Sequence, residues 1–451
     1  MKTDRLDKTI AVGLLAAVAF TALAHGAVEA WSIAVFELII VTLTLLWAIK
    51  SFIEKRFELR VPPTALPLAA FFVFGLIQSV FVTGADGQIS SLSFDVEATK
   101  SAVKILFFLL IAHILAANLF LSAERLRKLT VFLTIFGFAL AIFGLLQYFT
   151  WNGSIYWLRP AFVNTKGVIG PFVNHNHFAG YLGLIVPLPI ALIVTGAVNK
   201  NRLLYGFAAV MMAIAQAASL SRGGIISLVS GLSFIVIAGI SYTRRAKNSL
   251  PATEFGGEFP TNPKQSSLFN FGAVALILGA VVFGSLWIGN NSIVERLTKN
   301  NVVSADEKAE SFETSRGWIW NNTITMFQMN PVVGIGMGAF ETAYPQYSGD
   351  NSSLTLTVDR AHNDYLQILS DTGLIGGAIA LWFILTTIFV VGRSLGSRDP
   401  FRAGLAIGSG AAIFSMSVHS VFDFNLQLPA TALLFLILTA VSANLSASLK
   451  K

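Results

Sequence analysis

The sequence has no cysteine and little charge, and both deficits restrict what the protein can be. Without cysteine among its 451 residues, the chain can form no disulfide, no thiolate metal site and no cysteine nucleophile. Asp, Glu, Lys and Arg make up 12% of the residues, whereas about a quarter of a soluble domain is charged. With 54% hydrophobic residues and a mean hydropathy of +0.69, the composition is that of a polytopic membrane protein.

Apolar runs recur along the whole chain. Crossing roughly 30 Å of hydrocarbon takes about 20 helical residues, and these runs are too long and too evenly apolar for barrel strands. The sequence therefore predicts an all-α polytopic membrane protein, a single integral membrane domain over residues 1–451 with about 12 transmembrane helices. The predicted spans are residues 9–25, 31–49, 64–82, 102–120, 129–149, 177–197, 203–220, 224–241, 268–289, 373–392, 402–420 and 428–446.

The first apolar run also has features of a signal peptide. A charged start from Met1 to Lys8 precedes it, and Ala22-Leu23-Ala24 resembles a cleavage site. We favour a retained first helix, with cleavage as the alternative.

Basic residues are distributed unevenly between the two sides that these spans define. With the N-terminus inside, 21 of the 31 Lys and Arg residues fall on inside segments, so the positive-inside rule predicts that both termini are cytoplasmic. Five of the six histidines fall on the outside, so chemistry is expected to face the periplasm or the cell exterior. The ten basic residues on the outside are Lys100, Lys104, Arg159, Lys166, Arg222, Arg296, Lys299, Lys308, Arg316 and Arg360.

Two outside segments are long. Residues 150–176 are rich in aromatic residues and glycine, which predicts an interfacial or re-entrant segment. Residues 290–372 are predicted to form a large periplasmic loop subdomain that carries short helices. Within this loop, Thr314 or Ser315 can cap a helix that runs from about residue 316 to residue 329.

The segment 219–224, Ser-Leu-Ser-Arg-Gly-Gly, joins two predicted spans on the outside. Arg222 is costly near hydrocarbon unless an anion of matching geometry binds it. The glycines let backbone N–H groups approach a phosphate closely. The alternative is a tight helical hairpin with a snorkelling arginine.

The segment 314–320, Thr-Ser-Arg-Gly-Trp-Ile-Trp, places Arg316 and Trp320 on one helix face. That face suits an anion or a stacked sugar ring. The alternative is tryptophan anchoring at the membrane surface.

The segment 360–367, Arg-Ala-His-Asn-Asp-Tyr-Leu-Gln, is an unusually polar helix entry. It contains His362, the residue type that exchanges protons near neutral pH. Its neighbours Arg360, Asn363 and Asp364 could contact substrate. The alternative is a self-satisfied network in which Arg360 pairs with Asp364.

Two weaker groups lie on the same side of the membrane. Residues 174–177, Asn-His-Asn-His, enter one predicted span, and residues 419–425, His-Ser-Val-Phe-Asp-Phe-Asn, leave another. Asn174, His177 and His419 are candidate substrate contacts. We disfavour a metal site, because these histidines do not recur at metal-ligand spacing and no Asp-x-Asp sequence occurs.

Together these pieces resemble the O-antigen ligase and O-antigen polymerase superfamily of bacterial envelope glycosyltransferases. The resemblance covers roughly residues 170–425. Asn330, where many relatives carry histidine or aspartate, is a small departure. The resemblance is carried by the stretch 170–181, by 221–224, by Ser315-Arg316 with Trp320, by Asn330-Pro331 leading into 334–340, by His362-Asn363 and by 419–425.

The resemblance implies transfer of a glycan from undecaprenyl diphosphate to an acceptor hydroxyl, with no cofactor and no required metal. It implies that Arg222 and Arg316 hold the diphosphate, with Arg360 as a further contact. His362 would activate the acceptor or stabilise the leaving group. The expected partners are the undecaprenyl-diphosphate-linked glycan, an acceptor glycan or lipid A-core, and the lipid bilayer of the bacterial inner membrane, with no nucleic acid.

Residue chemistry agrees with this interpretation. Guanidinium groups stabilise charge that develops on a departing diphosphate, and a neutral His362 oriented by Asp364 or Asp359 can take the acceptor proton. Ligase and polymerase remain open, because the acceptor is not encoded in these motifs. Two other classes also remain open, a glycolipid transporter or flippase and a non-catalytic partner in polysaccharide export.

Overall fold

The computed structural model describes residues 2–83, 89–161, 167–247, 316–348 and 358–449. Within these ranges, nine helical segments are long and apolar enough to cross a membrane, which indicates a membrane protein. These are α1 (Lys2–Leu23), α2 (Ala30–Glu54), α4 (Val96–Leu119), α5 (Ala123–Phe149), α6 with α7 (His175–Ile185 and Pro187–Val194), α9 (Arg222–Lys247), α15 (Asp364–Ser394), α16 (Pro400–His419) and α17 (Pro429–Ser448).

Nine of the predicted spans coincide with these segments. Two more, 64–82 and 203–220, coincide with the shorter helices α3 (Ala65–Gln78) and α8 (Arg202–Ala218). The predicted span 268–289 lies outside the described residues, so the count of twelve stays a prediction.

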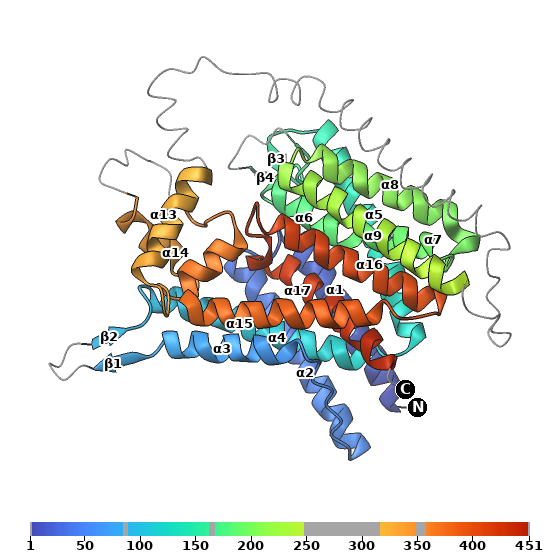
Figure 1. The fold of residues 1–451 in the computed structure, drawn as a ribbon, viewed down its shortest axis with the longest axis horizontal. Coiled ribbons are helices and arrows are strands. Elements are labelled where there is room, and N and C mark those ends of the chain that lie inside the picture. The colour runs from blue at the N-terminus through green and yellow to red at the C-terminus, as the bar shows by residue number, and fades with distance from the viewer. Residues whose placement is uncertain (1, 84–88, 162–166, 248–315, 349–357, 450–451) are drawn as a thin grey trace.

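The helices pack as a bundle in which some are central and others peripheral (Figure 1). In α17 and in the α6–α7 pair, 89% of the most apolar 18-residue stretch is buried inside the protein, whereas in α2 the buried share is 22%. α17 and the α6–α7 pair therefore form the centre of the bundle, and α2 presents most of its surface to the surroundings. The start of α1 and the end of α17 lie at one end of the bundle, and the short elements α13 (Arg316–Met329) and α14 (Phe340–Ala343) lie at the opposite end.

Proline and glycine set the two interruptions within the long helices. Pro187 has no backbone N–H to continue the helix, and the chain passes there from α6 to α7. α15 bends at Gly373, where φ is 61° and ψ is −159°, a conformation nearly restricted to glycine.

α15 begins nine residues before the predicted span 373–392. Its first turns are polar, but Gln367 is 2% exposed and Ser370 is 0% exposed, so neighbouring protein covers them. The hydropathy pattern therefore detected only the apolar part after the kink.

The described residues also contain two short antiparallel strand pairs. β1 (Phe81–Thr83) pairs with β2 (Ile89–Ser91), with Phe81 opposite Ser91. β3 (Ser154–Ile155) pairs with β4 (Arg159–Pro160) inside the predicted interfacial segment. Arg159 forms an ion pair with Glu29, and Nδ1 of His25 donates to the carbonyl oxygen of Pro171 at 2.8 Å. This segment therefore packs on the turn between α1 and α2, and its depth in the membrane stays a prediction.

Helix α13 confirms the helix predicted over residues 316–329. α13 contributes to a second hydrophobic core, which is separate from that of the bundle and smaller. The buried members of this core are Ile319, Met326, Ile335, Phe340, Ala343, Tyr344 and Ala361.

Candidate active site

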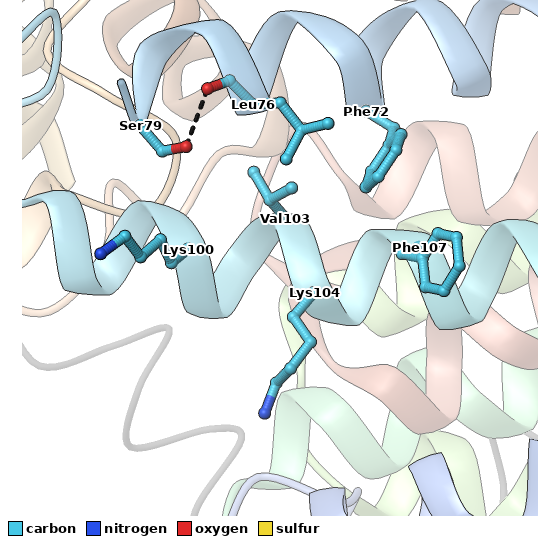
Figure 2. A pocket seen from close by; sticks show the side chains of 7 residues that line it. All are labelled: Phe72, Leu76, Ser79, Lys100, Val103, Lys104 and Phe107. Atoms are coloured by element: carbon cyan, nitrogen blue, oxygen red, sulfur yellow. Dashed lines mark hydrogen bonds between the residues drawn. The ribbon is translucent and has the colours of Figure 1, made fainter. Parts of the chain in front are cut away.

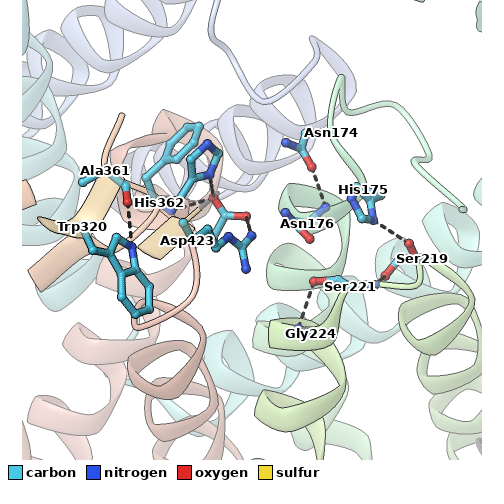
Figure 3. A network of polar contacts seen from close by, with 12 residues as sticks. Asn174, His175, Asn176, Ser219, Ser221, Gly224, Trp320, Ala361, His362 and Asp423 are labelled. Atoms are coloured by element: carbon cyan, nitrogen blue, oxygen red, sulfur yellow. Dashed lines mark hydrogen bonds and ion pairs between the residues drawn. The ribbon is translucent and has the colours of Figure 1, made fainter. Parts of the chain in front are cut away.

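Two side chains from separate segments meet at Asp423, which lies in the connection between α16 and α17. Nδ1 of His362 lies 3.1 Å from Oδ1 of this aspartate. A guanidinium nitrogen of Arg316, the first residue of α13, lies 3.7 Å from Oδ2. Figure 3 shows His362 and Asp423 in this group. The Asp423 side chain is 1% exposed, whereas the side chains of Arg316 and His362 are 39% and 27% exposed. Arg316 and His362 are therefore accessible to a substrate, and Asp423 is not.

The charge state of Asp423 determines which nitrogen of His362 can accept a proton. Burial alone would raise the pKa of Asp423, but the hydrogen bond from His362 and the nearby histidines outweigh burial and lower that pKa below its ordinary range. The carboxylate is therefore ionised at neutral pH, and Nδ1 carries the proton that it donates. Nε2 of the neutral ring then has a free lone pair, as a general base requires.

The backbone of His362 is held in an unusual conformation. Its φ is 50°, in the left-handed region that non-glycine residues seldom adopt. Both polar groups of the preceding Ala361 are fixed, because its N–H donates to Oε1 of Gln367 at 2.7 Å and its carbonyl oxygen accepts from Nε1 of Trp320 at 3.0 Å. Asn363 then caps α15 by accepting from the N–H groups of Tyr365 and Leu366. These contacts hold the imidazole toward Asp423.

The predicted substrate contacts next to His362 have structural partners. Asp364 is 3% exposed, donates its N–H to the carbonyl oxygen of Ser420 at 2.8 Å and accepts from the N–H of Leu426 at 3.3 Å. It therefore braces the α16–α17 connection. Arg360 donates to the carbonyl oxygen of Asp359 at 2.6 Å. The expectation that Asp364 or Asp359 orients the His362 ring is wrong, because Asp423 bonds to that ring.

His177 and His419 lie behind this surface, with exposures of 4% and 1%. The ring of Phe424 lies edge-on to both His177 and His362, with centroid distances of 4.9 Å and 5.0 Å. Among the described residues, neither histidine's ring nitrogens have a hydrogen-bond partner. Their predicted contact with substrate is thus not direct in this conformation. The described part of the chain contains no group of three or more His, Asp or Glu side chains placed to hold a metal ion.

The entry to α6 and the α8–α9 turn are tied to each other. Asn174 caps α6 by accepting from the N–H of Asn176 at 2.8 Å, and Nδ1 of His175 donates to the carbonyl oxygen of Ser219 at 2.7 Å. In the turn, Ser221 Oγ accepts from the N–H of Gly224 at 3.0 Å. Figure 3 shows this polar group beside His362 and Asp423.

Arg222 begins α9 with an exposed side chain. The next residue, Gly223, packs against the α16–α17 connection so closely that an added Cβ would lie 2.8 Å from Cβ of Phe422 and 3.0 Å from Cδ2 of His419. Glycine at this position therefore brings Arg222 next to the connection that carries Asp423.

A family model described as O-antigen ligase matches residues 207–381. These residues form an O-antigen ligase family domain. The predicted resemblance to the ligase and polymerase superfamily is confirmed over this part of the chain. No curated protein matches the sequence. The family indicates a membrane glycosyltransferase of the ligase or polymerase type.

The O-antigen ligase family domain contains most of the predicted site but not all of it. Arg222, Arg316, Trp320 and His362 lie within it, as do Arg360, Asn363 and Asp364. The carboxylate that joins His362 and Arg316 lies beyond it, as do Asn174, His177 and His419. The rest of the bundle thus supplies part of the site.

Asp423 is the residue that sequence reasoning left without a role. It stood in a motif noted for His419, and two acids nearer His362 in the sequence, Asp364 and Asp359, were preferred as partners. A signal did exist, because Asp423 is the sole Asp, Glu, Lys or Arg between Arg402 and Lys450. A lone carboxylate between two apolar helices is costly unless it is paired.

Proposed function

We propose that the protein is a membrane glycosyltransferase that moves a glycan from undecaprenyl diphosphate to an acceptor hydroxyl at the periplasmic face. The family domain supports the reaction class. The observation that carries the proposal is the contact of one buried carboxylate, Asp423, with His362 and Arg316.

In the proposed reaction, the acceptor oxygen attacks the anomeric carbon and its proton passes to Nε2 of His362. The bond between that carbon and the diphosphate oxygen breaks, and the diphosphate leaves with the electron pair. Asp423 stabilises the imidazolium that forms. General-base catalysis of this kind contributes about 10²- to 10⁴-fold in rate.

The leaving diphosphate gains negative charge, and the arginines are the groups to stabilise it. Arg316 and Arg222 begin α13 and α9, so the N–H groups of the first turns add positive dipole ends. Arg360 is a further phosphate contact in this proposal, and Trp320 offers a ring for a sugar. Asn174 and Asn363 cap α6 and α15, and Asp364 holds the α16–α17 connection to the start of α15. His177 and His419 are buried and shape the site from behind.

The proposed location is the bacterial inner membrane, with both termini cytoplasmic and the site facing the periplasm. The excess of basic residues on inside segments supports this orientation. Thiol labelling at the two ends of α15 tests it directly.

The site is tested by Arg222→Ala, Arg316→Ala and His362→Ala in the purified protein, assayed with a lipid-linked glycan and an acceptor. Each is expected to lower turnover by at least about 100-fold. Arg56→Ala is the matched control, because Arg56 is 76% exposed and pairs only with Glu58 among the described residues. Near-normal turnover in all three site variants, with the control also normal, would contradict the site assignment.

Ligase and polymerase are the two forms of this proposal, and they differ in the acceptor. Deleting the gene and analysing the surface glycans separates them. Polymer of normal length that is not attached to its acceptor indicates a ligase, and single repeat units indicate a polymerase. Unattached glycan that accumulates only on the cytoplasmic leaflet would instead indicate a flippase.

A further inference from the structure

An apolar groove of about 230 Å³ lies between α3 and α4, apart from the candidate active site. Figure 2 shows Phe72 and Leu76 of α3 facing Val103 and Phe107 of α4. Leu76 and Phe107 are 43% and 40% exposed, so the groove opens to the outside of the bundle. The seven residues that line it are Phe72, Leu76, Ser79, Lys100, Val103, Lys104 and Phe107.

The inner wall of the groove is closed by close packing. A Cβ added at Gly75 would lie 2.5 Å from Cγ2 of Val103 and 3.1 Å from Cε of Met337. The groove therefore does not continue into the protein toward the loop that carries Met337. Its occupant must enter from the surrounding bilayer.

Two lysines border this apolar groove, and Figure 2 shows the ammonium group of Lys104 on the side of α4 that faces away from α3. Lys100 and Lys104 are four residues apart, on one face of α4 and roughly 6 and 12 Å from its start at Val96. Both belong to the ten basic residues that oppose the positive-inside bias. Lysine in the membrane is costly unless it reaches the interface or a counter-charge.

The lysines have partners, but these leave capacity for an anion. Lys100 lies 2.8 Å from Glu97, and both side chains are at least half exposed, so this pair is weak and easily exchanged. Lys104 lies 3.0 Å from Glu37 of α2 and is 54% exposed. An ammonium group has three donors, so it can bind a phosphate oxygen while it keeps its glutamate.

The groove also lies at the same end of the bundle as the candidate site. The N–H of Phe94, just before α4, donates to the carbonyl oxygen of Ile335 at 2.8 Å. Oγ1 of Thr342 donates to Asp95 at 2.8 Å. The start of α4 thus contacts the segment that links α13 to α15, and in the proposed orientation the lysines lie in the leaflet next to the site.

We propose that the α3–α4 groove binds an anionic phospholipid of this leaflet, with one acyl chain in the apolar groove and the phosphate at Lys100 and Lys104. The acyl chain covers the exposed surfaces of Leu76 and Phe107, and the two lysines select an anionic head group. A bound lipid would brace α3 against α4 beside the loop that leads to His362.

The test measures lipid binding to the full-length protein in detergent by native mass spectrometry. Phosphatidylglycerol and phosphatidylcholine of equal chain length are the probes. We expect tighter binding of phosphatidylglycerol, and we expect Lys100→Gln with Lys104→Gln to weaken it by roughly fivefold per lysine, about 25-fold for both. Lys128→Gln is the matched control, because Lys128 also pairs with a glutamate four residues away, at 2.6 Å, on α5.

A second variant tests whether the acyl chain of the lipid lies in the groove. Leu76→Trp fills the groove from an exposed position and is expected to weaken binding of both lipids, while its unfolding temperature shows that the protein is folded. Equal binding of the two lipids, or an unchanged preference in the double lysine variant, overturns the proposal. Displacement of phosphatidylglycerol by a polyprenyl phosphate at lower concentration, dependent on the same lysines, overturns the assignment to a phospholipid.

Discussion

At the scale of single residues, one buried carboxylate organises the candidate site. Asp423 is almost inaccessible, and a buried charge is tolerated only where opposite charge and hydrogen bonds compensate for lost hydration. His362 and Arg316 supply that compensation from two other segments. The same contacts fix the imidazole tautomer and hold the arginine at the edge of the site, so stability and chemistry depend on the same residues.

Asp423→Asn should leave the fold intact and remove most of the activity. The amide can donate to Nδ1 of His362, which would move the ring proton to Nε2 and remove the base. We expect turnover to fall by about 10²- to 10⁴-fold, measured as glycan transfer by the purified protein.

The control for that substitution is Asp399→Asn. Asp399 caps α16 by accepting from the N–H of Arg402 at 2.8 Å, and asparagine is an equally good cap. This variant should keep near-normal turnover. If the two variants have the same activity, Asp423 does not set the state of His362.

The lowered pKa of Asp423 also predicts how stability depends on pH. Because this pKa is lower in the folded protein than the ordinary value of about 3.9, the carboxylate stabilises the fold above that value. Its contribution decreases as the pH falls through the lowered pKa. The difference in unfolding temperature between the native protein and Asp423→Asn should therefore be constant from about pH 8 to pH 5 and decrease below about pH 4.

Thermal unfolding in one detergent across this pH series provides the measurement. A difference that already shrinks between about pH 8 and pH 6 would show that a group other than this carboxylate governs the interaction.

At the scale of elements, the loop after α13 and the kink of α15 form one joint. The N–H of Gly338 donates to Oδ2 of Asp371 at 3.0 Å, and Nε2 of Gln367 donates to its Oδ1 at 3.0 Å. Gln78 of α3 donates to the backbone carbonyl oxygen of the same aspartate at 3.0 Å. The joint places α13, with Arg316, relative to α15, with His362.

Gly373→Ala should loosen this joint. Its φ of 61° disfavours any side chain, and an added Cβ would lie 2.4 Å from the carbonyl oxygen of Val332. We expect a loss of about 1 to 3 kcal/mol in unfolding free energy, seen as a lower unfolding temperature. Turnover should fall with it, because Arg316 and His362 would no longer be held together.

The same helix offers a matched control in Gly392, where an added Cβ meets nothing within 4 Å. Gly392→Ala should be neutral or more stable by up to about 1 kcal/mol, since alanine favours helix. Equal effects of the two substitutions would show that the strain at the kink is not the cause.

Helices were predictable where one local signal sufficed. The cap residues and the following proline located α13, and hydropathy located the apolar spans. The segment 360–367 was recognised as a helix entry from its polar residues, but hydropathy placed the span only from residue 373, because the polar first turns of α15 are buried by the joint rather than by lipid. Burial by another part of the chain leaves no trace in a local pattern.

At the scale of the whole molecule, orientation in the membrane is the property most open to a direct test. The absence of native cysteine allows single reporters. Asp359 and Arg398, both exposed, stand just beyond the two ends of α15. We expect an impermeant thiol reagent added to intact spheroplasts to label Asp359→Cys and not Arg398→Cys. The reverse pattern would contradict the proposed topology and place the site in the cytoplasm.

The sequence by itself predicted the membrane class, most helices, the family of residues 207–381 and the candidate residues Arg222, Arg316 and His362, because hydropathy, charge bias and short motifs are local properties. Only the tertiary structure decided which of these residues meet. Asp423 lies 61 residues beyond His362, and its pairing depends on how the α16–α17 connection packs against the entry to α15. The structure also shows that His177 and His419, expected to contact substrate, are buried. The sequence did not predict this, because side-chain burial depends on packing between distant segments.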